Sequence, residues 1–285
     1  MQRAREKEHQ LVDKVEAYEV LARYYDQLMD DIDYDYWCEY VLSLVERAED
    51  GGGRKAGDGK NSVKGPAFAS RLEGKRVLDL ACGTGQFSYR LQQRGLKVTA
   101  VDRSPEMLAI AEERARSKRL EITFICQDMR RLELPSTYDL VLCLCDSLNY
   151  LLEVEEVAQV LAKAAAVLEP GGHFVFDVNT AHKLATVYGN HVYAEDMGDF
   201  AYLWENEYHP ERQLCCMDLV FFVQTQSGLF EKLSESHVER AYPPELLREL
   251  VTRAGLELLG EYADLTLEPP GPTAERITFH CRKPL

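Results

Sequence analysis

An acidic side chain and two glycines lie close together in the stretch VLDLACGTGQF, residues 77–87. Asp79 precedes Gly83 and Gly85, which stand where an apolar, strand-like run passes into a helical one. Glycines in such a turn let a ligand lie directly against the backbone. The stretch therefore predicts a binding site for a small molecule.

A second acid narrows the ligand to a nucleoside. Asp102 ends the next strand-like run, KVTAVD, 17 residues after Gly85 (102 minus 85). An acid at the end of the second strand of an alternating strand and helix fold can accept hydrogen bonds from ribose hydroxyls. Together, the two glycines and Asp102 predict an adenosine-type nucleoside.

Two cofactors present adenosine to such a turn, NAD and S-adenosylmethionine. A dinucleotide normally needs a third glycine, as in G-x-G-x-x-G, but Ser88 stands at that position. The Asp79 carboxylate would repel a diphosphate, whereas it suits the ammonium group of a methionine moiety. Electrostatics therefore favours S-adenosylmethionine, and an NAD-dependent oxidoreductase is the alternative from another class.

Strand-like and helical runs alternate along the middle of the chain. The strands are expected at 76–80, 97–102, 121–126, 138–144 and 173–178, and the helices between them at 87–94, 105–119 and 154–168. Ser104 and Pro105 begin one of these helices as cap and first residue. Such alternation predicts an α/β fold with a doubly wound, mostly parallel sheet.

The remaining segments complete a division into five parts. Residues 1–50 are expected to form two helices, 51–70 a flexible insertion rich in Gly and Lys, and 71–186 the core. Residues 187–240 read as an antiparallel β insertion with a hairpin turn at Ser227-Gly228, and 241–285 as a helix followed by the last two strands. The insertion is expected to form a lid or a homodimer surface.

Five ordered motifs carry a resemblance to a known family. VLDLACGTG, AVDRSPEML, CQDMRRL, YDLVLCLCDSLNYL and LEPGGHFVFDV resemble those of the class I S-adenosylmethionine-dependent methyltransferases. The pattern Y-x-x-x-A-x-x-Y-D at 18–26 is similar to the front helices of the glycine N-methyltransferase and aminosugar N,N-dimethyltransferase group. The resemblance implies a seven-stranded Rossmann-like sheet with an antiparallel last strand, and front helices that close over the cofactor.

The resemblance also implies a role for each matching residue. The first glycine motif would surround the methionine part, Asp102 would hold the ribose, and Asp128 with the Met129 backbone would hold the adenine. Cys145 would offer its carbonyl near the sulfonium. The full set expected to bind the cofactor is Tyr18, Tyr25, Tyr34, Asp79, Ala81, Gly83, Gly85, Asp102, Arg103, Met107, Asp128, Met129 and Cys145.

Polar residues follow the fourth predicted strand in the run CDSLNY, residues 145–150. Methylases of base amino groups carry a Pro-Pro pair at this point, whereas no Pro-Pro follows Asp146. Asp146 and Tyr150 are the candidate catalytic groups, which could orient an amine or a hydroxyl, and Asp146 is equally suited to capping the next helix. His209 and His237 are further candidate bases, and the sequence does not choose between them.

Asn179 stands where the glycine enzymes place an arginine for the substrate carboxylate, so an amino-acid acceptor held in that manner is not expected. The sequence thus predicts methyl transfer from S-adenosylmethionine to nitrogen or oxygen of a small molecule, with S-adenosylhomocysteine as the product. The alternatives are methylation of RNA or protein, and a binding module without catalysis.

Composition limits the other partners. A formal net charge of −15 repels phosphate backbones and disfavours nucleic acid. No apolar run approaches the ~20 residues of a membrane span, and the first residues lack a signal-peptide pattern, so a cytoplasmic protein is expected. The eight cysteines form neither a C-x-x-C pair nor a zinc spacing, and no metal is expected.

Overall fold

The structure is a computed structural model that describes residues 18, 21–50 and 72–285. The insertion expected at 51–70 lies outside these residues, as does most of the segment before Leu21.

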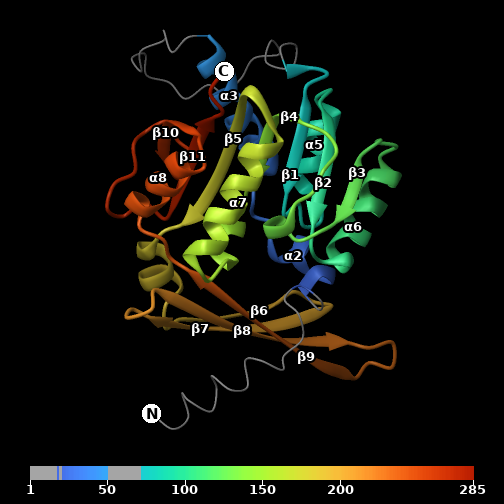
Figure 1. The fold of residues 1–285 in the computed structure, drawn as a ribbon. Helices are drawn as coiled ribbons and strands as arrows, with labels where there is room; N and C mark the ends of the chain where they lie inside the picture. Colours follow the sequence, from blue (N-terminus) through green and yellow to red (C-terminus); the bar gives the residue numbers. More distant parts are fainter. Residues whose placement is uncertain (1–17, 19–20, 51–71) are drawn as a thin grey trace.

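A seven-stranded sheet forms the centre of the fold, with strand order β10-β11-β5-β4-β1-β2-β3 (Figure 1). The pairs from β5 to β3 are parallel, whereas β11 is antiparallel to both β5 and β10. This order confirms the doubly wound sheet with an antiparallel last strand. The strands are β1 Arg76–Leu80, β2 Lys97–Asp102, β3 Thr123–Cys126, β4 Tyr138–Cys143, β5 Leu168–Asn179, β10 Glu257–Ala263 and β11 Arg276–Arg282.

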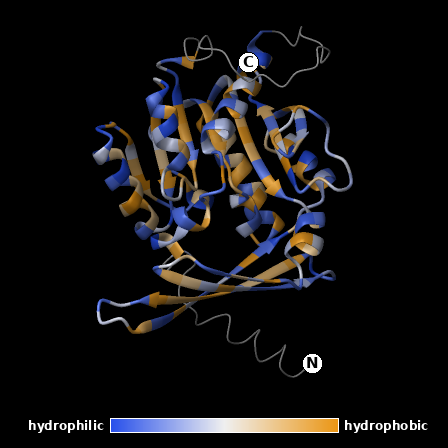
Figure 2. Ribbon diagram, turned by 180° about the vertical axis from the view of Figure 1, so that it is seen from behind, coloured by the Kyte–Doolittle hydropathy of each residue, from blue (hydrophilic) through white to orange (hydrophobic). Residues whose placement is uncertain are grey.

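Helices cover both faces of this sheet because its strands are apolar on both sides. Leu78 of β1 packs in the layer beneath α7 and α8, whereas its neighbour Val77 packs in the layer beneath α3 and α5. Figure 2 shows the resulting contrast between apolar central strands and helices of mixed hydropathy. The helices are α3 Tyr34–Glu49, α5 Gln86–Gln93, α6 Pro105–Ser117, α7 Val154–Val167 and α8 Pro244–Arg253.

Local signals set several helix boundaries. The Ser104 hydroxyl accepts a hydrogen bond from the Met107 N–H at 3.1 Å, and Pro105 is the first residue of α6. Gly95, with φ +86°, follows the end of α5. No helix of the described ranges is long and apolar enough to cross a membrane.

A second, antiparallel sheet lies across the end at which the parallel strands finish (Figure 1). Its strands, in spatial order, are β6 Val192–Asp196, β7 Phe200–His209, β8 Leu214–Gln224 and β9 Phe230–Arg240. The turn between β8 and β9 contains Ser227 and Gly228, as the sequence predicts. One face of this sheet packs on the front segment through an apolar cluster that includes Leu21, Leu184 and Phe221.

Short helical turns lie between the longer helices and strands. They are η1 Leu21–Arg23, α2 Tyr25–Leu28, η2 Met129–Arg131, η3 Ser147–Tyr150 and the π-helical η4 Lys183–Tyr188. Because η3 and η4 follow the carboxyl ends of β4 and β5, they lie where a doubly wound sheet binds its ligands.

Candidate functional site

One cavity gathers almost every residue that the sequence marks for the cofactor. It encloses an empty volume of ≈ 1030 Å³, counting the space open to solvent. Of the expected cofactor residues only Gly85 is absent from its wall, and of the two catalytic candidates Tyr150 lines it whereas Asp146 does not. The expected residues on the wall are Tyr18, Tyr25, Tyr34, Asp79, Ala81, Gly83, Asp102, Arg103, Met107, Asp128, Met129 and Cys145.

The two glycines of the first turn have different surroundings. Both have left-handed backbones, with φ +54° at Gly83 and +74° at Gly85. A Cβ on Gly83 would meet nothing within 4 Å, because this residue faces the open cavity. A Cβ on Gly85 would lie 3.0 Å from the Ala111 Cβ, so Gly85 instead permits the turn to pack on α6.

The Asp102 carboxylate fixes the glycine turn. Its Oδ2 accepts the Gly83 N–H at 2.8 Å, and its Oδ1 accepts the Ser104 N–H at 2.9 Å. Parallel pairing of β1 with β2 brings these loops to the same edge. Burial raises the Asp102 pKa, while the backbone N–H groups oppose that shift. The carboxylate thus joins two loops and still lines the cavity.

Asp79 places a buried carboxylate on the cavity wall. It is 2% exposed, and its Oδ2 accepts a hydrogen bond from the Ser88 hydroxyl at 2.5 Å. Burial raises the Asp79 pKa to about 7. Ser88, which stands in place of the third glycine of a dinucleotide site, therefore orients the acid. A desolvated carboxylate with one neutral side-chain partner is suited to an incoming cation.

Asp128 is a further carboxylate on the cavity wall. The Arg130 side chain and backbone N–H donate to its Oδ1 at 3.0 and 2.8 Å, and the Arg130 hydrogen bond holds the Asp128 pKa below its ordinary value. Arg103, Met107 and Met129 line the same cavity. The arrangement keeps an ionised acceptor on that wall.

Asp26 of α2 holds the front segment, which comprises Tyr18 and residues 21–34, against the core of the fold. Its carboxylate accepts hydrogen bonds from Thr84 Oγ1 at 2.7 Å and Gln86 Nε2 at 2.8 Å, and it forms an ion pair with Arg114. These contacts position Tyr18, Tyr25 and Tyr34 along the cavity. The Tyr34 hydroxyl is buried and has no hydrogen-bond partner among the described residues.

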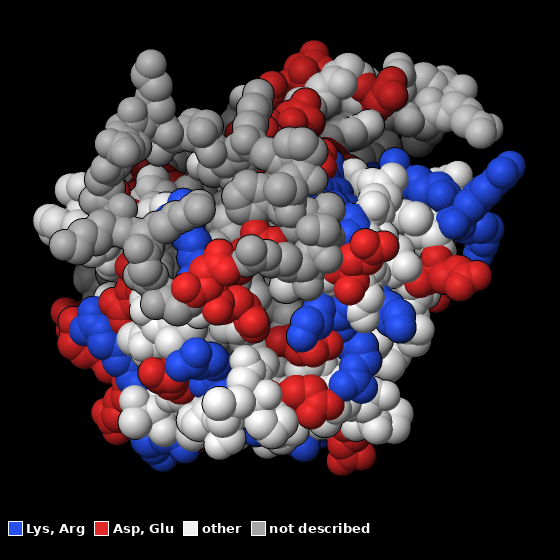
Figure 3. All heavy atoms as spheres, turned by 90° about the horizontal axis from the view of Figure 1, so that it is seen from above, with Lys and Arg blue, Asp and Glu red and all other residues white. Residues whose placement is uncertain are grey.

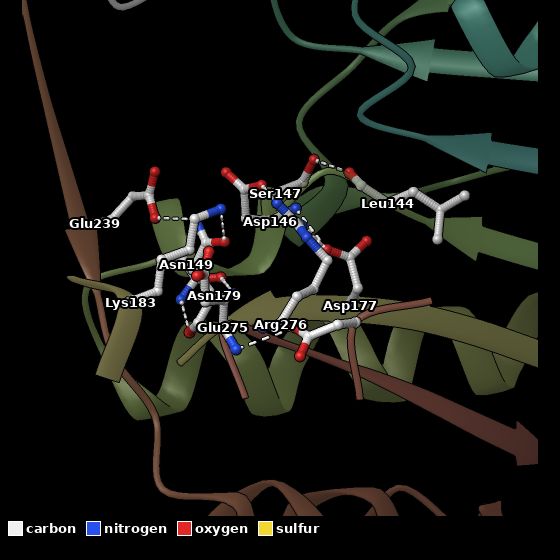
Figure 4. Close-up of polar contacts among 11 residues, drawn as sticks. Leu144, Asp146, Ser147, Asn149, Asp177, Asn179, Lys183, Glu239, Glu275 and Arg276 are labelled. Carbon is white, nitrogen blue, oxygen red and sulfur yellow. Dashed lines mark hydrogen bonds and ion pairs between the residues drawn. The ribbon is translucent and has the colours of Figure 1, made fainter. Parts of the chain in front are cut away.

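Beyond β4 the chain enters a strained turn. Cys145 and Asp146 have consecutive positive φ values of +55° and +51°, which are rare for residues with side chains. The Asp146 side chain does not cap η3, so that alternative is wrong. Instead, Arg276 Nη2 donates to Asp146 Oδ1 at 2.7 Å, and Arg276 Nη1 donates to Asp177 (Figure 4).

A second polar network joins η3, β5, η4 and β9. The Asn149 side chain donates to the Asn179 carbonyl at 3.0 Å and to the Arg240 carbonyl at 2.9 Å. Asn179 Nδ2 in turn donates to Glu239 Oε2 at 2.9 Å, and Lys183 Nζ donates to Asn179 Oδ1 at 3.1 Å (Figure 4). Asn179 is therefore a link between the two sheets.

The structure separates the two candidate histidines. His237 of β9 is 3% exposed, and its ring lies 4.9 Å from that of Tyr18 and 5.8 Å from that of Tyr150, between ring centroids. His237 Nε2 is 2.7 Å from Glu235 Oε1. His209 lies at the far end of β7 with a side chain that is 38% exposed. Only His237 contacts residues of the cavity wall.

Several polar residues near Tyr150 and Asp146 were not predicted: Asp177, Lys183, Glu235, Glu239 and Arg276. Arg276 faces Asn179 across the β5–β11 register, so a guanidinium reaches this region from another strand. No local pattern marks Arg276. The sequence does contain a signal for Glu235 and Glu239. Together with His237 they are polar residues at every second position, which places them on one face of a strand.

No group of three or more His, Cys, Asp or Glu side chains is placed to hold a metal ion within the part of the chain that is described. All eight cysteines are free, and Cys126 is the exposed one among them.

Known proteins resemble this chain in sequence and in fold. A family model described as a methyltransferase domain matches residues 77–172. A protein of Geobacillus sp. (strain WCH70) that is named as a methyltransferase is 33% identical over 267 residues, which cover 94% of this chain and 100% of the relative.

Two solved structures share the fold. An S-adenosylmethionine-dependent methyltransferase from Clostridium acetobutylicum ATCC 824 is 29% identical with a TM-score of 0.78, covering 94% of this chain and 99% of that one. A sugar N-methyltransferase from Streptoalloteichus sp. ATCC 53650 is 19% identical with a TM-score of 0.68, covering 96% of this chain and 95% of that one.

Proposed function

This chain belongs to the S-adenosylmethionine-dependent methyltransferase family, and we propose that it methylates a nitrogen or oxygen of a small molecule. The observation that carries the proposal is the packing of two rings against Tyr150. Tyr18 and His237 cover the Tyr150 ring, with centroids 5.6 and 5.8 Å away. An acceptor that reaches this end of the cavity must fit beneath β9, which suits a small molecule.

The residues present fit the cofactor. Asp79 offers a buried carboxylate, the Tyr34 hydroxyl has no hydrogen-bond partner in the described part of the chain, and Gly83 leaves an open side against which a ligand can lie. When bound, S-adenosylmethionine would supply a methyl group on a sulfonium; a bond from the acceptor to that methyl carbon would form as the carbon–sulfur bond breaks, with S-adenosylhomocysteine as the leaving group. The NAD alternative fits less well because Asp79 of β1 and Ser88 of α5 flank the turn that a diphosphate would need.

Each cavity residue then has a physical task. Asp79, kept in place by Ser88, would bind the ammonium group, and Asp102 would accept from the ribose hydroxyls. Asp128, held by Arg130, would accept from the adenine amino group. The tyrosines of the front segment would cover the ligand and exclude water, since positioning contributes most to an in-line displacement.

The expected partners follow from charge. The net charge of −15 disfavours RNA. In Figure 3 acidic and basic side chains are interspersed over the visible face. A homodimer formed through the second sheet and a cytoplasmic location stay predictions from the sequence.

Two measurements test the proposal. Thermal shifts with S-adenosylhomocysteine and NAD should show stabilisation by the former, since a ligand that binds only the folded state raises Tm. Transfer of a tritiated methyl group should then label a small-molecule extract and not bulk tRNA or protein. Asp79→Asn serves as the binding-deficient control. Label that enters only tRNA or protein would contradict the small-molecule acceptor.

A further inference from the structure

Strand β9 presents titratable side chains to the interior. Glu235, His237 and Glu239 are each 2–3% exposed, and they pair in register with Leu219, Met217 and Cys215 of β8. Alternate residues of a strand share one face, so the three polar side chains lie beside an apolar row on the inner side of the sheet. Burying such groups is costly unless each has a partner.

Two members of this row form a close pair. Glu235 Oε1 lies 2.7 Å from His237 Nε2, and the Glu235 carboxylate also accepts the backbone N–H groups of Tyr18 and, at 3.0 Å, Leu21. This pair fastens the front segment to β9. Holding the front segment over the cavity accounts for the Glu235–His237 pair. Glu239 is then the member of the row without an assigned role.

Among the residues that the structure describes, one oxygen of Glu239 has no hydrogen-bond partner. Asn179 Nδ2 occupies its Oε2 at 2.9 Å, while Figure 4 shows the other oxygen turned away from Asn179 with no contact drawn. Among the residues described, Glu239 forms no ion pair: Arg276 is held by Asp146 and Asp177, and Lys183 Nζ donates to Asn179. Within the described ranges no cation forms an ion pair with this carboxylate, although burial of a charge is costly without one.

The charges around Glu239 favour a cation over an anion. Four carboxylates, Asp146, Asp177, Glu239 and Glu275, surround two cations, Arg276 and Lys183, which gives a formal sum of −2 (−4 plus 2). Both terminal nitrogens of Arg276 already donate to carboxylates. A carboxylate acceptor would find no free guanidinium edge here and would be repelled by the excess of acids.

Glu239 does not line the cavity itself, but its charge acts on Tyr150, which does. β9 packs over η3, and the Asn149 amide ties the two together. After burial, the charges of Glu239 and then Asp146 contribute most to raising the pKa of Tyr150, which lines the cavity. The free carboxylate oxygen is thus close to the one catalytic candidate on the wall.

We propose that the Glu239 carboxylate receives the ammonium group of the acceptor, so that the molecule methylated is an amine. This inference rests on the proposed function and narrows it. The sugar N-methyltransferase that shares the fold acts on nitrogen by its name, in agreement with this class.

The same carboxylate activates the bound amine. The N–H bond of the ammonium breaks, its electron pair stays on nitrogen, and the proton forms an O–H bond on the free oxygen of Glu239. The products are a neutral amine with a lone pair and a neutral carboxylic acid. Burial, reinforced by the charge of Asp146, raises the Glu239 pKa to about 8, which makes it a competent proton acceptor for an amine.

The test divides a small-molecule extract of the source organism by charge. A cation exchanger separates retained amines from neutral and acidic compounds, and each fraction is offered with tritium-labelled S-adenosylmethionine. We expect label in the retained fraction. Label only in the unretained fraction overturns the amine acceptor and leaves the proposed function standing, whereas no label in either fraction contradicts the proposed function itself.

A matched pair of variants ties the result to Glu239. Glu239→Gln keeps an acceptor for Asn179 but removes the charge, and Glu231→Gln removes an exposed charge from the same strand. We expect at least about a 100-fold loss of kcat/KM with the retained fraction in the first variant and none in the second. Unchanged S-adenosylhomocysteine affinity in Glu239→Gln would show that the cofactor site is intact.

A readout that needs no turnover completes the test. An infrared difference spectrum between pH 6 and pH 9 should contain a protonated carboxyl band that titrates near pH 8 and disappears in Glu239→Gln. Equal kcat/KM in the wild type and Glu239→Gln, or an unchanged carboxyl band in that variant, would overturn the assignment.

Discussion

Arg276 on β11 and Asp146 on the turn after β4 form an ion pair, with Nη2 2.7 Å from Oδ1. Arg276 also pairs with the fully buried Asp177 of β5. The guanidinium therefore holds the strained turn against the sheet, and Asp146 acts through this network rather than from the cavity wall.

Arg276→Met should be strongly destabilising. The change leaves two carboxylates without their cation, and breaking a buried pair in this way costs about 3–5 kcal/mol. Denaturant unfolding at pH 8 measures the loss. Arg282→Met is the control, because its pair with Glu257 on the surface is worth at most ~1 kcal/mol. Equal effects from the two variants would refute the central role of Arg276.

Asp79→Asn should stabilise the ligand-free protein in alkaline solution and abolish cofactor binding. The native pKa of about 7 exceeds the ordinary value of 3.8, so the native state binds more protons and the unfolding free energy falls as pH rises from about 4 to 7. The variant should gain ~2 kcal/mol or more over wild type at pH 8, less at pH 5, and little at pH 4.

Unfolding curves and calorimetric titration with S-adenosylhomocysteine check both effects. A stability difference that is the same at pH 5 and pH 8 would show that Asp79 titrates normally. Retained affinity would remove Asp79 from the proposed ammonium site.

Gly83→Ala and Gly85→Ala should damage different properties. Either alanine adopts a left-handed backbone at a cost of ~1–2 kcal/mol. Gly85→Ala also places its Cβ 3.0 Å from that of Ala111, and such overpacking adds about 1–3 kcal/mol. Gly83→Ala fills open cavity space, so it should chiefly lower S-adenosylhomocysteine affinity. The reverse pattern would contradict these placements.

Tyr34→Phe should leave the ligand-free protein as stable as wild type, or slightly more so, while weakening S-adenosylhomocysteine binding. The lost hydroxyl is buried and no described residue is its hydrogen-bond partner, and such a group contributes nothing to folding until a ligand binds to it. Tyr242→Phe is matched in chemistry but removes a hydrogen bond to the Leu151 carbonyl, which should cost ~1 kcal/mol. A similar loss in Tyr34→Phe would mean that its hydroxyl is already satisfied.

The sheet, the helices on its faces and most of the cavity wall could be predicted from the sequence. Asp79, Gly83 and Asp102 each stand at the end of a strand or in the turn that follows it, and parallel strands bring such ends to one edge. Periodicity and turn chemistry are local properties, so the order of motifs was enough to place these residues together.

The contacts at the acceptor end depend on tertiary packing. The Arg276 pair with Asp146, the Asn179 link to Glu239 and the choice of His237 over His209 all join segments far apart in the chain. Gly83 and Gly85 likewise appear equivalent until α6 is packed against one of them. Such contacts depend on how two sheets are placed against each other, and no local pattern of residues encodes that placement.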